Sequence, residues 1–163
     1  MLVNKRANKK RKLNHLKGSW TVAEIEISYK SIIANHTIIS SSSQAYELIK
    51  QLWESEKINL QEQFAALFFN QSKKIIGWKV LSTGNMTKCI VDIKLLVSLA
   101  LHCMCTHVMI VHNHPSGNLK ASQCDEKITL TVKEALKLID VQLIDHLIIV
   151  ENGYFSFNDE GLL

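Results

Sequence analysis

The stretch VMIVHNHPSG, residues 108–117, joins a short apolar run to a polar segment that contains the chain's only proline. Apolar residues from Val108 to Val111, bounded by polar ones, are typical of a buried strand. Proline and glycine favour irregular structure, so the segment from His112 to Ser122 is predicted to be a loop. The stretch therefore predicts a buried strand with a polar loop at its end.

Amphipathic helices are predicted before and after this strand. Asp92 precedes the first helix, and Ser122 offers an N-cap for the second. The predicted core faces are Ile93, Leu96, Val97, Ala100, Leu101 and Met104 in the first helix, and Ile128, Val132, Ala135, Leu136 and Ile139 in the second. Each helix is therefore expected to cover a sheet with one apolar face.

The rest of the chain also alternates between helical and strand patterns. A third helix is predicted to follow the serine run 40–43 and to end near Glu56. Its core face comprises Ala45, Leu48, Ile49, Leu52 and Trp53. Further strands are predicted at Ala23–Tyr29, Phe64–Phe69, Lys74–Leu81, Leu147–Val150 and Tyr154–Phe157. The order β-α-β-β-α-β-α-β-β favours an α/β fold, with a mixed sheet in a three-layer α/β/α arrangement.

The composition indicates one globular domain. The chain has 163 residues, of which 47% are hydrophobic and 21% charged, and it contains too little glycine and proline for a fibrous or disordered class. No apolar run approaches the roughly 18 residues that cross a bilayer, so no membrane segment is expected. The cysteines at positions 89, 103, 105 and 124 follow no disulfide framework, which predicts a reducing, cytoplasmic location.

Positive charge is concentrated at the N-terminus. The first 17 residues contain seven lysines and arginines and no acidic residue, although the whole chain carries only +4. We therefore divide the chain into a basic, disordered tail, residues 1–18, and a folded domain, residues 19–163. Such a tail can contact nucleic acid nonspecifically. Because both arginines, Arg6 and Arg11, lie in it, sequence-specific DNA reading by the folded part is disfavoured.

Two histidines and an aspartate suggest a metal site. His112 and His114 are two positions apart, so in an extended backbone both imidazoles point to the same side. Asp125 falls in the first turn of the helix that Ser122 caps, where the helix dipole favours a carboxylate. Two nitrogens and one oxygen leave a tetrahedral position open for water, which is the pattern of a catalytic zinc site.

A general base is expected beside such a site. Zinc lowers the pKa of its bound water to about 7, and a second group must take up the proton. Glu62, at the start of the strand from Phe64, is our choice of base. The residues alone leave Glu24 and Glu26 equally open.

Structural roles compete with these assignments. His-x-His pairs are common without metal, and Ser122 with Asp125 is equally an ordinary helix cap. Cys103 and Cys105 are not expected to form a metal pair, because the thiols of two residues so spaced on a helix diverge by about 200°. Packing or surface exposure is predicted for His102, His107 and His146.

The candidate site residues resemble a protein family. The spacing of His112, His114, Ser122 and Asp125 resembles the His-x-His-x7-Ser-x2-Asp signature of JAMM (JAB/MPN) metalloproteases. The chain also resembles the RadC branch of this family, whose name is associated with DNA repair. The segments that resemble it are HNHPSG at 112–117, DHLII at 145–149, YFSF at 154–157, EIEISY at 24–29 and QEQF at 61–64. The resemblance covers about residues 20–163.

The resemblance implies a JAB/MPN fold, related to the deaminase-like α/β/α sandwich, and one zinc ion held by His112, His114 and Asp125. It also implies that Glu62 is the base that activates water and that Ser122 donates a hydrogen bond to the developing oxyanion. The implied activity is hydrolysis of a peptide or isopeptide bond in a peptide or protein substrate. The alanine before Ser122 departs from the proline that RadC-like sequences usually have there.

Three functions can be compared on these grounds. A zinc-dependent hydrolase is preferred. The alternative is a non-catalytic MPN binding module that takes part in DNA transactions through residues 1–17. Nuclease action by the same site ranks last, because a single three-ligand site lacks the second cation common in phosphodiester cleavage.

Overall fold

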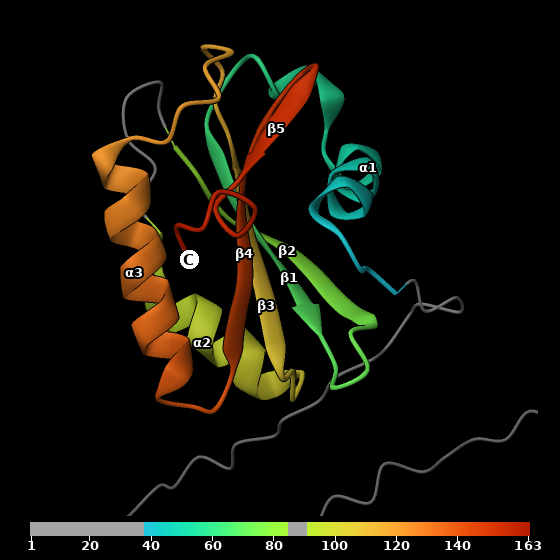
Figure 1. The fold of residues 1–163 in the computed structure, drawn as a ribbon, viewed down its shortest axis with the longest axis vertical. Helices are drawn as coiled ribbons and strands as arrows, with labels where there is room; N and C mark the ends of the chain where they lie inside the picture. The colour runs from blue at the N-terminus through green and yellow to red at the C-terminus, as the bar shows by residue number, and fades with distance from the viewer. Residues whose placement is uncertain (1–37, 85–90) are drawn as a thin grey trace, which may run out of the picture.

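The structure, a computed structural model, describes residues 38–84 and 91–163. Within these residues, a mixed β-sheet lies between two layers of helices (Figure 1). The predicted tail 1–18, the predicted strand Ala23–Tyr29 and Cys89 lie outside the described residues. For the described part, the predicted three-layer α/β/α architecture is confirmed.

The described strands pair in the order β2-β1-β3-β4-β5. Their bounds are β1 Gln63–Phe69, β2 Ile75–Thr83, β3 His107–Asn113, β4 Gln142–Val150 and β5 Gly153–Ser156. Among these strands β3 and β4 run parallel, and the other neighbours run antiparallel. This confirms the predicted mixed sheet and the hairpin of β1 and β2. The central strand is β3, which pairs with β1 along one edge and with β4 along the other.

Helices cover both faces of the sheet (Figure 1). In the described part of the chain, the α-helices are α1 Ser42–Leu52, α2 Ile93–His102 and α3 Gln123–Lys137, and a short 3-10 helix spans Ser55–Lys57. Successive side chains of a strand point to opposite faces, so Leu67 of β1 packs in the core beneath α1, whereas Phe68 packs in the core beneath α2 and α3. In the described ranges, no helix is long and apolar enough to cross a membrane.

Helix α1 begins at the predicted serine run but ends earlier than predicted. Ser41 is the N-cap, and its hydroxyl accepts a backbone N–H from the first turn at 3.2 Å. The helix ends at Leu52 rather than near Glu56, because Trp53 adopts an extended conformation. The Trp53 ring is buried and packs edge-on against Trp78 of β2, with 5.8 Å between centroids. Burial of this ring accompanies the early end of the helix.

The end of α2 differs from the predicted helical stripe. The helix ends at His102, and Met104 has a positive φ of 52°. Met104 is 81% exposed and Leu101 is 50% exposed, so neither belongs to the core as predicted. A hydrogen bond between the thiols of Cys103 and Cys105 lowers the pKa of Cys103 to about 7. The prediction that these thiols diverge is wrong, because the helix does not continue through both residues.

Strand β3 extends further than predicted. The apolar run from Val108 to Val111 is in the strand, but His112 and Asn113 continue the pairing with β1 or β4. Both polar side chains are buried, with exposed fractions of 1% and 0%. The loop therefore begins at His114, and two polar residues lie inside the paired sheet.

Candidate metal centre

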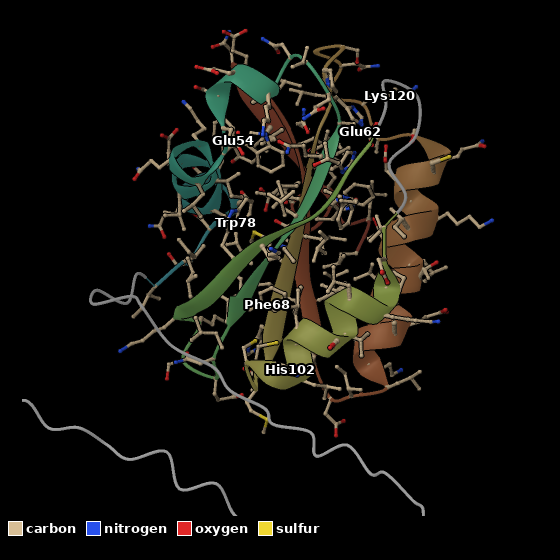
Figure 2. All side chains as sticks on the ribbon, turned by 180° about the vertical axis from the view of Figure 1, so that it is seen from behind. Glu54, Glu62, Phe68, Trp78, His102 and Lys120 are labelled. Carbon is tan, nitrogen blue, oxygen red and sulfur yellow. The ribbon has the colours of Figure 1, made fainter. Side chains whose placement is uncertain are left out.

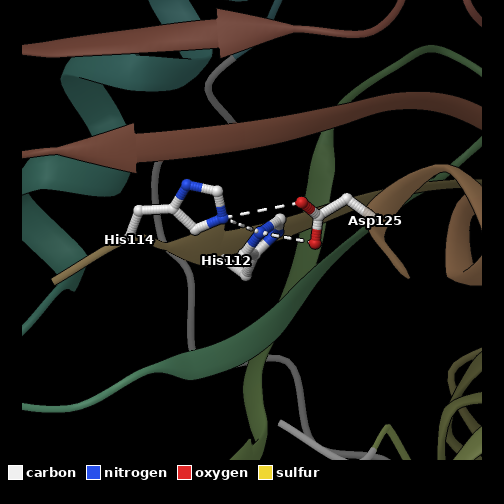
Figure 3. A group of neighbouring side chains, drawn as sticks. All are labelled: His112, His114 and Asp125. Carbon is white, nitrogen blue, oxygen red and sulfur yellow. Dashed lines mark hydrogen bonds and ion pairs between the residues drawn. The ribbon is translucent and has the colours of Figure 1, made fainter. Parts of the chain in front are cut away.

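Three side chains with metal-binding atoms meet at the C-terminal end of β3 (Figure 3). They are His112, His114 and Asp125, and their ligand atoms all lie within 4.8 Å of one another. The two Nε2 atoms are 2.9 Å apart. The Asp125 carboxylate lies 3.1 Å from His112 Nε2 and 3.6 Å from His114 Nε2. The structure thus brings together the three residues that the sequence predicts as ligands.

The backbone at the end of β3 places both imidazoles. The N–H of His114 donates to the Ile149 carbonyl of β4 at 3.0 Å, so the chain stays extended just beyond His112. Side chains two positions apart on an extended chain point to the same side, as predicted. His114 Nδ1 lies 2.6 Å from the Asn118 carbonyl. A carbonyl only accepts, so a neutral His114 ring carries its proton on Nδ1 and keeps the Nε2 lone pair for a ligand.

The first turn of α3 supplies the third ligand. Ser122 is the N-cap: its hydroxyl accepts the Asp125 N–H at 3.2 Å, and its own N–H donates to the Asp125 carboxylate at 2.7 Å. This capping box fixes the carboxylate at the helix N-terminus, where the dipole favours negative charge. The Ser122 hydroxyl also donates to that carboxylate, at 2.6 Å. In this structure Ser122 therefore positions a ligand.

Glu62 immediately precedes β1, at the same end of the sheet as the triad. Because β1 runs antiparallel to β3, the start of β1 lies beside the end of β3. Figure 2 labels Glu62 at the same end of the molecule as Lys120, which belongs to the loop between β3 and α3, and at the opposite end from His102. Of the other two carboxylates weighed as the base, Glu24 and Glu26, the structure describes neither.

The interactions within the site favour the ionised form of Asp125 and the protonated form of His114. Burial alone would raise the pKa of Asp125, but the hydrogen bonds that His112 and His114 donate to it when their rings are protonated outweigh burial and hold this pKa well below its usual range. The hydrogen bond to Asp125 raises the pKa of His114, and the charges of Asp125 and Glu62 act in the same direction. A bound cation would take the place of the proton on His114.

Asn113, between the two histidines, ties β3 to the segment that enters β1. Its side-chain oxygen accepts the N–H of Gln63 at 2.7 Å, and its amide donates to the carbonyls of Ile58 and Gln61 at 2.7 and 2.9 Å. These bonds fix the backbone on both sides of Glu62. Asn113 was not among the residues predicted for the site, although its position between two candidate ligands was a signal in the sequence.

His146 is a second residue whose contacts the sequence analysis missed. It lies in β4 and is fully buried. Its Nε2 lies 2.8 Å from His112 Nδ1, and its Nδ1 lies 2.6 Å from the hydroxyl of Thr129 in α3. Burial lowers the pKa of His146 well below its usual value, so the ring is neutral. The predicted packing role is correct but incomplete. The available signal was the polar pair Asp145-His146 beside an apolar run.

The three ligand atoms fit a small divalent cation. Ligands at about 2.0–2.1 Å from zinc in a tetrahedron lie about 3.4 Å from one another. The two Nε2 atoms are 2.9 Å apart, and they lie 3.1 and 3.6 Å from different oxygens of Asp125. One ligand atom from each residue lies within 4.8 Å of the other two. Without protons, two nitrogen lone pairs and a carboxylate repel one another, and a bound cation removes that repulsion. Nitrogen and oxygen donors suit zinc and several other divalent ions, and three protein ligands leave a position for water.

Replacing Asn113 is expected to destabilise the protein. Asn113→Ala leaves the N–H of Gln63 and two carbonyls buried without partners, at a cost of about 1–3 kcal/mol each. The free energy of unfolding should fall by at least about 2 kcal/mol in urea denaturation of the metal-free protein. Asn152→Ala, at an exposed turn position, is the control and should change it by less than about 0.5 kcal/mol. Equal effects of the two substitutions would contradict the anchoring role.

Zinc affinity and the stability of the metal-free protein should depend on pH with opposite signs. His114 must lose its proton to bind zinc, so affinity should rise as pH increases through its raised pKa. In the metal-free protein, the raised pKa contributes stability that is complete below the unfolded-state value of 6.5 and is lost as pH rises through the folded-state pKa. Zinc titration and urea denaturation between about pH 5.5 and 8.5 measure both quantities. A pH-independent zinc affinity would rule out His114 as a ligand.

Known proteins are similar to this chain over most of its length. A family model described as a RadC-like JAB domain matches residues 39–162. A UPF0758 protein from Flavobacterium johnsoniae is 40% identical over 124 residues, which cover 76% of this chain and 53% of the relative. A UPF0758 protein from Streptococcus suis is 31% identical over 135 residues, which cover 83% of this chain and 53% of the relative. A UPF0758 protein from Porphyromonas gingivalis is 41% identical over 104 residues, which cover 63% of this chain and 46% of the relative.

The chain spans about half the length of the curated relatives it matches. Their shared name states no activity. The family model, by contrast, covers nearly all of the described fold, including the triad, Glu62 and Ser122. The sheet and its helices are also consistent with a JAB/MPN domain. The chain therefore belongs to the RadC-like JAB domain family.

Proposed function

We propose that this chain is a metal-dependent hydrolase in which His112, His114 and Asp125 hold one zinc ion. The observation that carries the proposal is the convergence of two imidazole nitrogens and one carboxylate within 4.8 Å at the end of the central strand. The JAB domain superfamily includes hydrolases, which supports the same assignment. A bound zinc ion would polarise a substrate carbonyl and bring the pKa of a bound water to about 7.

Glu62 is proposed to accept the proton of that water and to deliver it to the leaving group. Its side chain is partly exposed, and its charge acts on His114. The hydrogen bonds of Asn113 hold the backbone on both sides of it. A carboxylate on a restrained backbone, open to solvent and within electrostatic range of the ligands, is suited to proton transfer.

Ser122 is proposed to donate a hydrogen bond to the developing oxyanion. Both its N–H and its hydroxyl donate to the same oxygen of Asp125, at 2.7 and 2.6 Å. The N–H bond can keep the carboxylate oriented while the hydroxyl rotates towards substrate. Ser122 would then hold the ligand in the resting protein and stabilise negative charge during the reaction.

The proposed substrate is a peptide or isopeptide bond in a peptide or protein. Amide hydrolysis requires a polarised carbonyl, an activated water and a proton for the leaving amine. The three ligands, Glu62 and Ser122 together meet these requirements. The family resemblance of the motif supports the same substrate class.

The metal site predicts about one zinc ion per chain. Protein purified without a chelating column should contain it by elemental mass spectrometry, and the double variant His112→Ala/His114→Ala should contain none. The matched control is His102→Ala/His107→Ala, which removes two histidines outside the triad and should retain zinc. A parent protein that stays free of metal after zinc is added would refute the proposal and favour the binding-module alternative.

Glu62→Gln should separate metal binding from hydrolysis. The amide cannot take up the proton, so cleavage of a proteome-derived peptide mixture by the zinc-loaded protein should fall by about 100-fold or more. Zinc content should stay at the parental level, because Glu62 is not one of the ligands. Glu54→Gln, at an exposed residue paired with Lys57, should cleave at the parental rate. New peptide termini are counted by mass spectrometry, and unchanged cleavage by Glu62→Gln would exclude this residue as the base.

A further inference from the structure

A line of buried polar groups runs behind His112, on the side away from the other ligands. His112 Nδ1 lies 2.8 Å from His146 Nε2, and His146 Nδ1 lies 2.6 Å from the hydroxyl of Thr129. That hydroxyl is 2.5 Å from the backbone carbonyl of Asp125, one turn earlier in α3. The exposed fractions of the three residues are 1%, 0% and 3%, so bulk water does not reach these contacts.

The carbonyl at the end of the line determines the direction of each hydrogen bond. A carbonyl oxygen only accepts, so Thr129 must donate its single proton to Asp125. The Thr129 oxygen then accepts the Nδ1–H of His146. A neutral His146 with its proton on Nδ1 has a lone pair on Nε2, so His112 must donate its own Nδ1–H to it. The neutral His112 ring is left with an unprotonated Nε2 that faces His114 and Asp125.

We propose that Thr129 and His146 form a positioning relay, which holds His112 with its proton on Nδ1 and its Nε2 ready to bind metal. The inference rests on the proposed metal-binding function and adds two residues that act through a ligand. His114 reaches the same tautomer directly, because its Nδ1 contacts the Asn118 carbonyl. His112 lies within the paired sheet and reaches a carbonyl through two intervening side chains.

Packing keeps the rings of the relay in place. Phe157 stacks on His146 with 4.6 Å between centroids, and Phe64 stacks on His112 at 6.1 Å. The N–H of His146 donates to the carboxylate of Asp145 at 2.7 Å, which restrains the backbone. Rotation of either ring, which would exchange its two nitrogens, is opposed by these neighbours. The relay also joins β3, β4 and α3, so it couples the orientation of one ligand to the helix that supplies another.

The tautomers can be read in the metal-free protein. Long-range 1H–15N correlation spectra of protein labelled with 15N-histidine distinguish a proton on Nδ1 from one on Nε2, at alkaline pH where the rings are neutral. We expect His112 and His146 both to carry their proton on Nδ1. A folded, metal-free parent in which His112 carries its proton on Nε2 overturns the proposal, whatever its affinity for zinc.

Thr129→Val tests the relay, since it keeps the shape of the side chain and removes the hydroxyl. Without an acceptor at Nδ1, His146 is expected to move its proton to Nε2. The bond to His112 then reverses, and the proton of His112 moves to the nitrogen that faces the metal site. Zinc affinity, measured by competition with a chromophoric chelator, should fall by about 10–100-fold. Thr129→Ser retains the hydroxyl and should restore both the tautomers and the affinity.

Thr131→Val is the matched control on the same helix. Thr131 is exposed, and its hydroxyl donates to the carbonyl of Lys127, four residues earlier, at 2.9 Å. Thr131→Val makes the same chemical change as Thr129→Val, but at a residue outside the relay. It should therefore leave the histidine tautomers and the zinc affinity unchanged. Circular dichroism checks folding. Should Thr129→Val not fold, the parental tautomers and the zinc affinity of Thr129→Ser decide the question.

The outcomes separate the relay from the metal site itself. A folded Thr129→Val protein with parental tautomers and parental zinc affinity overturns the relay and leaves the proposed metal function standing. An equal loss of affinity in Thr131→Val also overturns the relay, because it assigns the effect to the helix. A parent that binds no zinc overturns both proposals.

Discussion

The polar groups buried at the end of β3 must find hydrogen-bond partners, and the rest of the site depends on this requirement. β3 is paired along both edges, and its last two residues, His112 and Asn113, are almost completely buried. A buried donor or acceptor without a partner costs about 1–3 kcal/mol. Asn113 meets the requirement by fixing the backbone around Glu62, and His112 meets it through His146. The bonds that allow the strand to be buried are therefore the bonds that assemble the site.

The ligands come from two kinds of secondary structure, and each is held in a different way. The histidines are oriented by the sheet, where the alternation of side chains sends both to one side. Asp125 is oriented by the capping box of α3, where the N-terminal dipole favours its charge. Thr129 stands one turn after Asp125 and contacts His146, so the helix and the sheet are also joined behind the ligands. The geometry of the triad thus depends on how α3 sits on the sheet.

Predictions from local pattern failed at the C-terminal ends of two helices. Trp53 continues the apolar stripe of α1, yet it leaves the helix and packs against Trp78 of a distant strand. Met104 continues the stripe of α2, yet it adopts a left-handed conformation and lies in solvent. The cost of leaving a helix early is small beside the gain from burying a large aromatic ring. A periodic pattern therefore predicts that a helix exists more reliably than it predicts where the helix ends.

The sequence by itself determined the order of the described helices and strands, the cap at Ser122, and the common side of His112 and His114. These features depend on residues within one turn or one strand, whose hydrogen-bond geometry is local. Only the tertiary structure decided that Asn113 would anchor the start of β1, 50 residues away, and that His146 would lie behind His112, 34 residues away. Both contacts follow from strand order and register, which depend on burial across the whole sheet and leave no fixed spacing in the chain.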